Sequence, residues 1–190
     1  MSCFRMLVVT LVLALLAGCA SMSESQCRVA DWGRVGLSDG ARGEPEQRLA
    51  SYSEDCGKIG VVPNAQAYRQ GWDVGIQQYC TPANGWQAGL AGQSYKAQSC
   101  TGQAQGLAFS QYLQAGLQLH YTQTQINNNL LEINRLQKIL EAPGSDEDKR
   151  HARRRLQDVD RDQYRLRLLM GQQQLLAPGT LTPPMPFLFQ

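Results

Sequence analysis

Glycines spaced three or four residues apart, each group beside an aromatic residue, are the feature that most limits how this chain can fold. They occur in three segments that resemble one another, residues 31–40, 67–75 and 85–92. In a helix this spacing places the glycines on one face, where a second backbone can approach closely. Glycine inside a helix costs about 0.5–1 kcal/mol relative to alanine, so its repetition indicates that tertiary packing compensates. The alternative is a series of glycine turns.

Capping residues favour helices over turns. Asn64 is a good N-cap for the helix that follows it, because its side-chain oxygen can accept from the first free amides. Asn84 and Thr101 are similarly placed before two later segments. We therefore expect helices over about residues 29–42, 44–56, 65–80 and 85–95, and another after Cys100.

The first 19 residues are typical of an export signal that ends in a lipid attachment site. Arg5 precedes an apolar run of about ten residues, too short for a membrane span of about 20. Leu16-Ala17-Gly18-Cys19 resembles a bacterial lipobox, in which the cysteine becomes the acylated N-terminus. The alternative is an ordinary cleavage site with a chance cysteine. Ala20, rather than Asp, follows Cys19, which by resemblance to Gram-negative sorting signals implies the periplasmic face of the outer membrane.

Two further segments have the composition of tether and tail. Residues 19–26 are small and polar, so we expect a disordered, lipidated tether there. Residues 178–190 contain several prolines and cannot continue a helix. This tail is either disordered or docks its aromatic residues in a groove.

Four cysteines remain once the signal peptide and the lipid site are set aside: Cys27, Cys56, Cys80 and Cys100. An even number in an exported chain favours two disulfides. A metal site fits poorly, because no C-x-x-C pair occurs, and we predict neither metal nor cofactor. If the helix over 29–42 folds back on the next one, residues 27 and 56 lie opposite each other. This favours Cys27 with Cys56 and leaves Cys80 for Cys100.

Aromatic residues, glycines and cysteines follow a specific order over roughly residues 27–130. The order is carried by Asp31, Trp32, Gly36, Asp39, Gly40, Cys56, Gly60, Pro63, Tyr68, Gly71, Gly75, Tyr79, Cys80, Gly85, Gly89, Gly92, Tyr95 and Cys100. It resembles the family of proteobacterial lipoproteins catalogued as domain of unknown function 2799. The resemblance implies a secreted, lipidated protein built around these cysteines, and it supplies no catalytic residue.

After Gly102 the chain changes character. Residues 97–131 carry no Asp, Glu, Lys or Arg, and no proline occurs before Pro143, so one helix of up to about 40 residues can form. Its expected apolar seam alternates steps of four and three, at positions 126, 130, 133, 137 and 140. A second helix over about 146–176 follows, and Ser145-Asp146-Glu147-Asp148 at its start resembles a capping box. Its seam is expected at 156, 159, 163, 166, 170 and 173, which predicts an antiparallel hairpin.

The second helix begins with a basic run at residues 149–155. Such a run can bind anionic lipid or nucleic acid. Acidic residues flank it, however, and Asp146 with Arg150 and Arg154 with Asp158 have the i,i+4 spacing of helix-stabilising pairs, so we favour a solvated face. The whole chain carries 18 basic and 16 acidic residues, and we therefore expect no nucleic-acid partner.

Motifs for catalysis are lacking in the sequence. His120 lies in the uncharged stretch 97–131 and His151 in the basic run 149–155. No G-x-S-x-G, H-E-x-x-H, Walker or G-x-G-x-x-G motif occurs. Asp31, Asp39 and Asp73 could pair as carboxylates acting on a glycan or peptidoglycan. We favour the alternative, that they cap helices or bond to Arg34, Arg42 and Arg69. The expectation is a protein that is not an enzyme and has no catalytic residue.

These patterns together predict an all-α protein, a small glycine-rich, disulfide-bonded helical domain followed by a long antiparallel, coiled-coil-like helical hairpin. The expected parts are a signal peptide (1–18), a lipidated tether (19–26), the Gly/Cys-rich domain (27–100), the hairpin (101–177) and a Pro-rich tail (178–190). We expect an envelope protein held on the membrane by acyl chains on Cys19, with a structural or protein-interaction role. Its hairpin would bind another envelope protein or a second copy. The alternative function is a cell-wall hydrolase.

Overall fold

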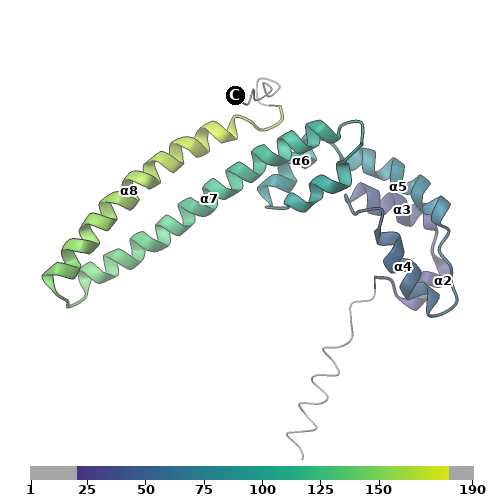
Figure 1. The fold of residues 1–190 in the computed structure, drawn as a ribbon, viewed down its shortest axis with the longest axis horizontal. Helices are drawn as coiled ribbons and strands as arrows, with labels where there is room; N and C mark the ends of the chain where they lie inside the picture. The colour runs from purple at the N-terminus through teal and green to yellow at the C-terminus, as the bar shows by residue number, and fades with distance from the viewer. Residues whose placement is uncertain (1–20, 180–190) are drawn as a thin grey trace, which may run out of the picture.

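The computed structural model describes residues 21–179, and these residues form helices without strands. The elongated, arched molecule has α2 to α5 at one end and the α7–α8 hairpin at the other (Figure 1). The fold class predicted from the sequence is confirmed. The elements are α2 (Glu24–Val29), α3 (Trp32–Ala41), α4 (Arg48–Gly57), α5 (Ala65–Tyr79), α6 (Pro82–Leu90), the 3₁₀ helix η1 (Ser94–Cys100), α7 (Gly106–Glu141) and α8 (Asp146–Gln174).

The expectation of a disordered tether is wrong for residues 21–26. Ser23 caps α2 through a capping box with Gln26, so a helix begins inside the expected tether. The backbone amide and the hydroxyl of Ser21 each donate to Asp55 Oδ2 of α4 at 2.7 Å. These bonds attach the chain to the folded part from Ser21 onward.

Helix boundaries differ from the prediction where a cap intervenes. The expected helix over 29–42 is divided into α2 and α3, because Asp31 is the N-cap of α3 and accepts from the Arg34 amide at 3.1 Å. Thr81, rather than Asn84, caps α6. Thr101 follows η1 and caps no α-helix, since α7 begins only at Gly106.

Close packing of α3 against α5 explains the first glycines. A Cβ atom at Gly36 would lie 1.9 Å from the carbonyl oxygen of Tyr68, and one at Gly40 would lie 2.5 Å from that of Trp72. Because the contact advances along both helices in the same direction, the two helices run parallel. The glycines predicted to share a helix face therefore do so, and their lack of a side chain brings the two backbones together.

The pair formed by α6 and α7 repeats this arrangement. A Cβ atom at Gly85 would lie 2.2 Å from the carbonyl oxygen of Phe109, and one at Gly89 would lie 2.3 Å from that of Leu113. From the α7 side, a Cβ atom at Gly116 would lie 2.5 Å from the carbonyl oxygen of Trp86. This second pair is parallel as well.

Corresponding turns and disulfides extend the repetition beyond the helix contacts. The turn after α3 contains Gly43 at φ +66° against the Tyr79 ring, and the turn after α6 contains Gly92 at φ +72° against the His120 ring. In each unit one cysteine precedes the first helix, and the other lies at the end of the short helix, α4 or η1, within the connection to the second. The chain thus contains two copies of one unit, helix, connection and parallel helix, each closed by a disulfide.

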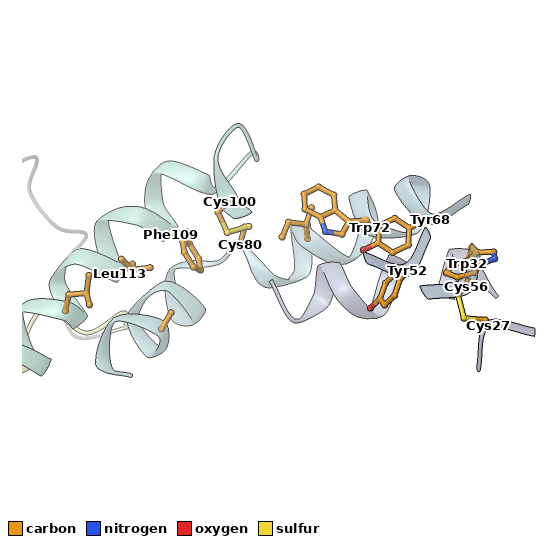
Figure 2. Packing of buried hydrophobic residues seen from close by; sticks show 13 residues of the cluster. Cys27, Trp32, Tyr52, Cys56, Tyr68, Trp72, Cys80, Cys100, Phe109 and Leu113 are labelled. Atoms are coloured by element: carbon orange, nitrogen blue, oxygen red, sulfur yellow. A yellow bond between two sulfur atoms is a disulfide. The ribbon is translucent and has the colours of Figure 1, made fainter. Parts of the chain in front are cut away.

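One buried cluster spans both units, from the Cys27–Cys56 disulfide to the first half of α7 (Figure 2). Phe109 and Leu113 of α7 are fully buried in it, and the Tyr79 and Phe109 rings lie 5.5 Å apart. The expected boundary at residue 100 is therefore not a structural boundary. The first half of α7 completes the glycine-rich part, and the rest of α7 extends from it.

The α7–α8 hairpin has the predicted seam on α8 but not on α7. Val159, Gln163 and Leu166 are buried, as their spacing predicts. On α7 the expected positions Leu130 and Gln137 are exposed, and the buried or half-buried series runs through 122, 126, 129, 133, 136 and 140. The seam thus differs from the prediction by one residue at two positions. Asn129 replaces Leu130 and donates to Asp162 of α8 at 2.9 Å, and Leu136 replaces Gln137 and packs with Ala152 and Val159.

None of the helices in residues 21–179 has the length and apolar character needed to cross a bilayer.

Candidate functional site

Of the site residues predicted from the sequence, Cys19 lies outside the described residues, as do residues 1–18 and 180–190. The four other cysteines form the two disulfides expected, Cys27 with Cys56 and Cys80 with Cys100, each with 5.5 Å between Cα atoms. Both are buried. They are structural links in the core.

The three aspartates considered as catalytic carboxylates occupy different positions. Asp31 caps the start of α3, and Arg34 lies 3.6 Å from it. Asp39 is buried near the end of the same helix, about 12 Å further along its axis at 1.5 Å per residue. Asp73 is exposed on α5. Asp31 therefore caps a helix and Asp39 bonds to an arginine, Arg42, which are the two structural roles favoured from the sequence.

Asp39 is the centre of a buried polar network. Only 1% of the residue is exposed, and its Oδ2 accepts hydrogen bonds from the hydroxyls of Tyr52 and Tyr68, both at 2.9 Å. Its Oδ1 accepts from Arg42 at 2.5 Å. Arg48 Nε donates to Tyr52 Oη at 2.7 Å and so extends the network toward solvent. The carboxylate ties α3, α4 and α5 together.

Both phenols of this network remain protonated donors. Burial raises the pKa of Tyr68 far above its ordinary value, and the negative charge of Asp39 beside it acts in the same direction. Burial also raises the pKa of Tyr52, although the hydrogen bond from Arg48 opposes that change. A tyrosine in this state cannot act as a base near neutral pH. The network therefore has the properties of a structural cluster.

Lys96 forms a second buried polar group at the junction of the two units. Its Nζ donates to the carbonyl oxygens of Arg42 and Gly43 at 3.0 and 3.1 Å and to Glu44 Oε1 at 3.2 Å. Burial acts to raise the pKa of Glu44, but the hydrogen bonds and charges of Lys96 and Arg48 outweigh it and leave the pKa below its ordinary value. The lysine fastens η1 to the turn that follows α3.

Sequence reasoning did not identify Lys96, Tyr52 or Tyr68 as members of these networks. Lys96 is the last charged residue before the uncharged stretch 97–131, which is a weak signal that it is buried. No local pattern marks the tyrosines, because they reach Asp39 from separate helices.

A surface depression of about 400 Å³ lies between α4 and α5. It is lined by Glu46, Gln47, Leu49, Ala50, Ser53 and Arg69. Glu46 and Arg69 form an ion pair across it at 2.8 Å, so Arg69 bonds to Glu46 rather than to one of the aspartates. The depression is open to solvent, and neither of the buried networks lines it.

The hairpin seam contains a buried side-chain amide. Gln163 is 5% exposed, and neither its nitrogen nor its oxygen has a hydrogen-bond partner among the residues that the structure describes. Thr122, also buried, donates to the Gln118 carbonyl of its own helix instead. The seam is thus less apolar than its spacing alone suggests.

Metal-ligating side chains do not gather in the described part of the chain: no group of three or more His, Cys, Asp or Glu residues there could hold an ion.

Comparison with known proteins identifies a family that is similar over part of the chain. Residues 31–118 match the model of a family described as "Protein of unknown function (DUF2799)", which is the domain of unknown function that the sequence resembles. The match begins at the N-cap of α3 and ends in α7, so it spans the helices of both glycine-packed units and leaves out most of the hairpin. Searches of curated proteins and of solved structures find no match.

Proposed function

We propose that this protein is a lipid-anchored envelope protein with a structural or protein-interaction role rather than an enzymatic one. The observation that carries the proposal is the hairpin. It projects well beyond the disulfide-bonded units (Figure 1), and α7 alone is about 54 Å long at 1.5 Å per residue. Exposed Leu131, Tyr164 and Leu168 lie on this projection, at 68%, 68% and 55% of their area. Such side chains suit a protein partner or a second copy.

The anchor is proposed at Cys19, through acyl chains on the periplasmic face of the outer membrane. Support for the anchor comes from the lipobox-like sequence Leu16-Ala17-Gly18-Cys19. Ser21, two residues after Cys19, is fixed to Asp55 by two hydrogen bonds. Lys58 and Ser21 hold the pKa of Asp55 far below its ordinary value, so Asp55 is an anion near neutral pH. With so short a connection, acyl chains on Cys19 would hold the α2–α4 end of the molecule close to the bilayer.

A non-enzymatic role is supported by what the carboxylates do. Asp31 is used as a helix cap and Asp39 as the buried partner of two tyrosines and Arg42. An active site built from these groups would need them to converge in a cleft. In the described chain they are instead spread along α3.

Metabolic labelling with a fatty-acid analogue tests the anchor. The full-length chain is expected to carry the label and to sediment with outer membranes, and the Cys19→Ser variant is expected to lose both properties. Labelling that is unchanged in Cys19→Ser contradicts the anchor.

The enzymatic alternative has its own test. Purified protein is incubated with peptidoglycan fragments, and Asp31→Asn is the matched variant, because it keeps an N-capping side chain. No turnover is expected from either protein. Turnover by the wild type that Asp31→Asn abolishes would support a cell-wall hydrolase instead.

A further inference from the structure

Helix α8 is the end of a row of three helices. α7 lies between α6 and α8 (Figure 1). It contacts α6 at Gly116 and α8 through Leu136, which packs with Ala152 and Val159. Within residues 21–179, α7 is the only element in extensive contact with α8, and the residues of α8 turned away from α7 are exposed. The row can therefore accept one more helix.

That side of α8 carries a regular stripe, here called the outer face. Its residues follow one another at alternating steps of four and three and are all exposed: Arg150, Arg154, Gln157, Arg161, Tyr164 and Leu168. The stripe is about 27 Å long at 1.5 Å per residue. Steps of four and three are the spacing with which one helix packs along another.

The first part of the outer face is basic. Arg150 and Arg154 make no ion pair with any residue in the described chain, whereas Arg161 is paired with Asp158. No acidic residue belongs to the stripe itself. Asp162 turns toward α7, where it accepts from Asn129. The i,i+4 pairs expected from the sequence, Asp146 with Arg150 and Arg154 with Asp158, therefore do not form. An approaching surface would meet two guanidinium groups that hold no ion-pair partner within the described chain.

The second part of the outer face is apolar. Tyr164 and Leu168 are one turn apart and remain 68% and 55% exposed. Gly171 continues the spacing, and a Cβ atom there would meet nothing within 4 Å. A side chain from a partner can approach α8 closely at this point.

A narrow stripe favours a helix over a lipid surface. Helices that lie in a bilayer interface bury a broad apolar face. The stripe instead has two apolar residues in line, Tyr164 and Leu168, at the spacing with which one helix packs along another. Asp158, next to the stripe, is half exposed and would be repelled by anionic lipid.

We propose that the outer face of α8 binds an acidic amphipathic helix of another protein, with glutamates or aspartates facing Arg150 and Arg154 and a leucine-type side chain over Tyr164 and Leu168. The inference rests on the proposed interaction role of the hairpin and names the chemistry of the partner.

The test uses the mature chain with Cys19→Ser and labelled synthetic helices of 28 residues, a length of about 42 Å that exceeds the stripe. One peptide has leucine at the seam positions and glutamate beside them, and its control has lysine in place of glutamate. Fluorescence anisotropy is expected to show saturable binding that is at least tenfold tighter for the acidic peptide. Leu168→Ser and Arg154→Gln are each expected to weaken it at least fivefold. Leu131→Ser, an exposed change on α7, is the matched control and is expected to leave binding unchanged.

Several results would overturn the inference. These are no binding, equal binding of the two peptides, or binding that Leu168→Ser leaves intact. Arg154-dependent binding to anionic phospholipid vesicles without peptide selectivity would assign the face to a membrane. A dimer that Leu168→Ser dissociates would assign it to a second copy. None of these results removes the anchor or an interaction made elsewhere on the hairpin, so the proposed function is tested separately.

Discussion

Replacing Gly36 by alanine tests the packing that holds the first unit together. Alanine is the better helix former, so on local grounds Gly36→Ala should stabilise α3 by about 0.5–1 kcal/mol. The added Cβ would lie 1.9 Å from the Tyr68 carbonyl oxygen and 3.0 Å from the Trp72 amide nitrogen, both backbone atoms of α5. The two helices must therefore move apart by roughly 1 Å or more to restore ordinary van der Waals contact.

The expected net effect is a loss of stability. Overpacking of a well-packed core costs about 1–3 kcal/mol, which exceeds the gain in helix propensity. We therefore expect the free energy of unfolding to fall by about 1–2 kcal/mol in Gly36→Ala. Gly171→Ala is the matched control, since a Cβ atom there meets nothing within 4 Å. It should stabilise the protein by about 0.5–1 kcal/mol, the opposite sign for the same chemical change.

Urea denaturation of the oxidised protein measures both variants. Trp32, Trp72 and Trp86 lie in α3, α5 and α6, so tryptophan fluorescence reports on the glycine-packed units, and far-UV circular dichroism adds the hairpin. If Gly36→Ala and Gly171→Ala shift the unfolding free energy in the same direction by similar amounts, close backbone packing does not explain the glycines.

Three further predictions concern the polar groups. Asp39→Ala leaves the buried hydroxyls of Tyr52 and Tyr68 without their acceptor and should reduce the unfolding free energy by about 3 kcal/mol in urea titrations. The pKa of Glu44 is lower in the folded state, so its stabilising contribution is complete above the unfolded value of 4.5 and declines as the pH falls below it. Urea titrations at pH 7 and pH 3 should show this decline, and Lys96→Met should diminish it. Gln163→Leu removes a buried amide without partners and should stabilise the hairpin by about 1 kcal/mol or more in thermal unfolding followed by circular dichroism.

Each of these predictions has a contrary outcome. Unchanged stability of Asp39→Ala would mean that the tyrosines find other partners at no cost. If wild type and Lys96→Met lose the same stability between pH 7 and pH 3, protonation of Glu44 is not the cause of that loss. A less stable Gln163→Leu variant would show that the amide makes a favourable contact in solution.

The disulfides and most helices could be predicted, because the number of cysteines and the capping residues can be read directly from the sequence. An even number of cysteines, in a chain expected to be exported, predicted two disulfides, and the expected fold-back of residues 29–42 paired Cys27 with Cys56. The pairing is correct, but α2 rather than α3 is the helix whose backbone packs against α4. Asn64 and Ser145 cap α5 and α8 as their side chains suggest. The likeness of residues 31–40, 67–75 and 85–92 was visible in the sequence, but their assembly into two parallel helix pairs was not predicted, because it depends on backbone contacts of Gly36 and Gly85 with other helices.

Two of the wrong expectations, the disordered tether and the seam on α7, have identifiable physical causes. Residues 21–26 are polar, but Ser23 and Gln26 have the spacing of a capping box, a local signal that was present, and the Ser21 bonds to Asp55 are long-range. On α7 the apolar periodicity favoured Leu130, whereas a polar pairing with Asp162 across the hairpin selects Asn129. A cross-helix hydrogen bond of this kind cannot be read from one helix.

Photo-crosslinking in living cells tests the central claim, that this is an anchored interaction protein, most directly. A photoreactive residue is placed at exposed hairpin positions between Gln118 and Gln173, with Val62, which is 85% exposed near the start of α5, as the reference position. We predict a reproducible protein adduct from hairpin positions that is absent from Val62 and is lost when Cys19→Ser removes the anchor. No adduct from any hairpin position, together with turnover of peptidoglycan fragments that Asp31→Asn abolishes, would contradict it.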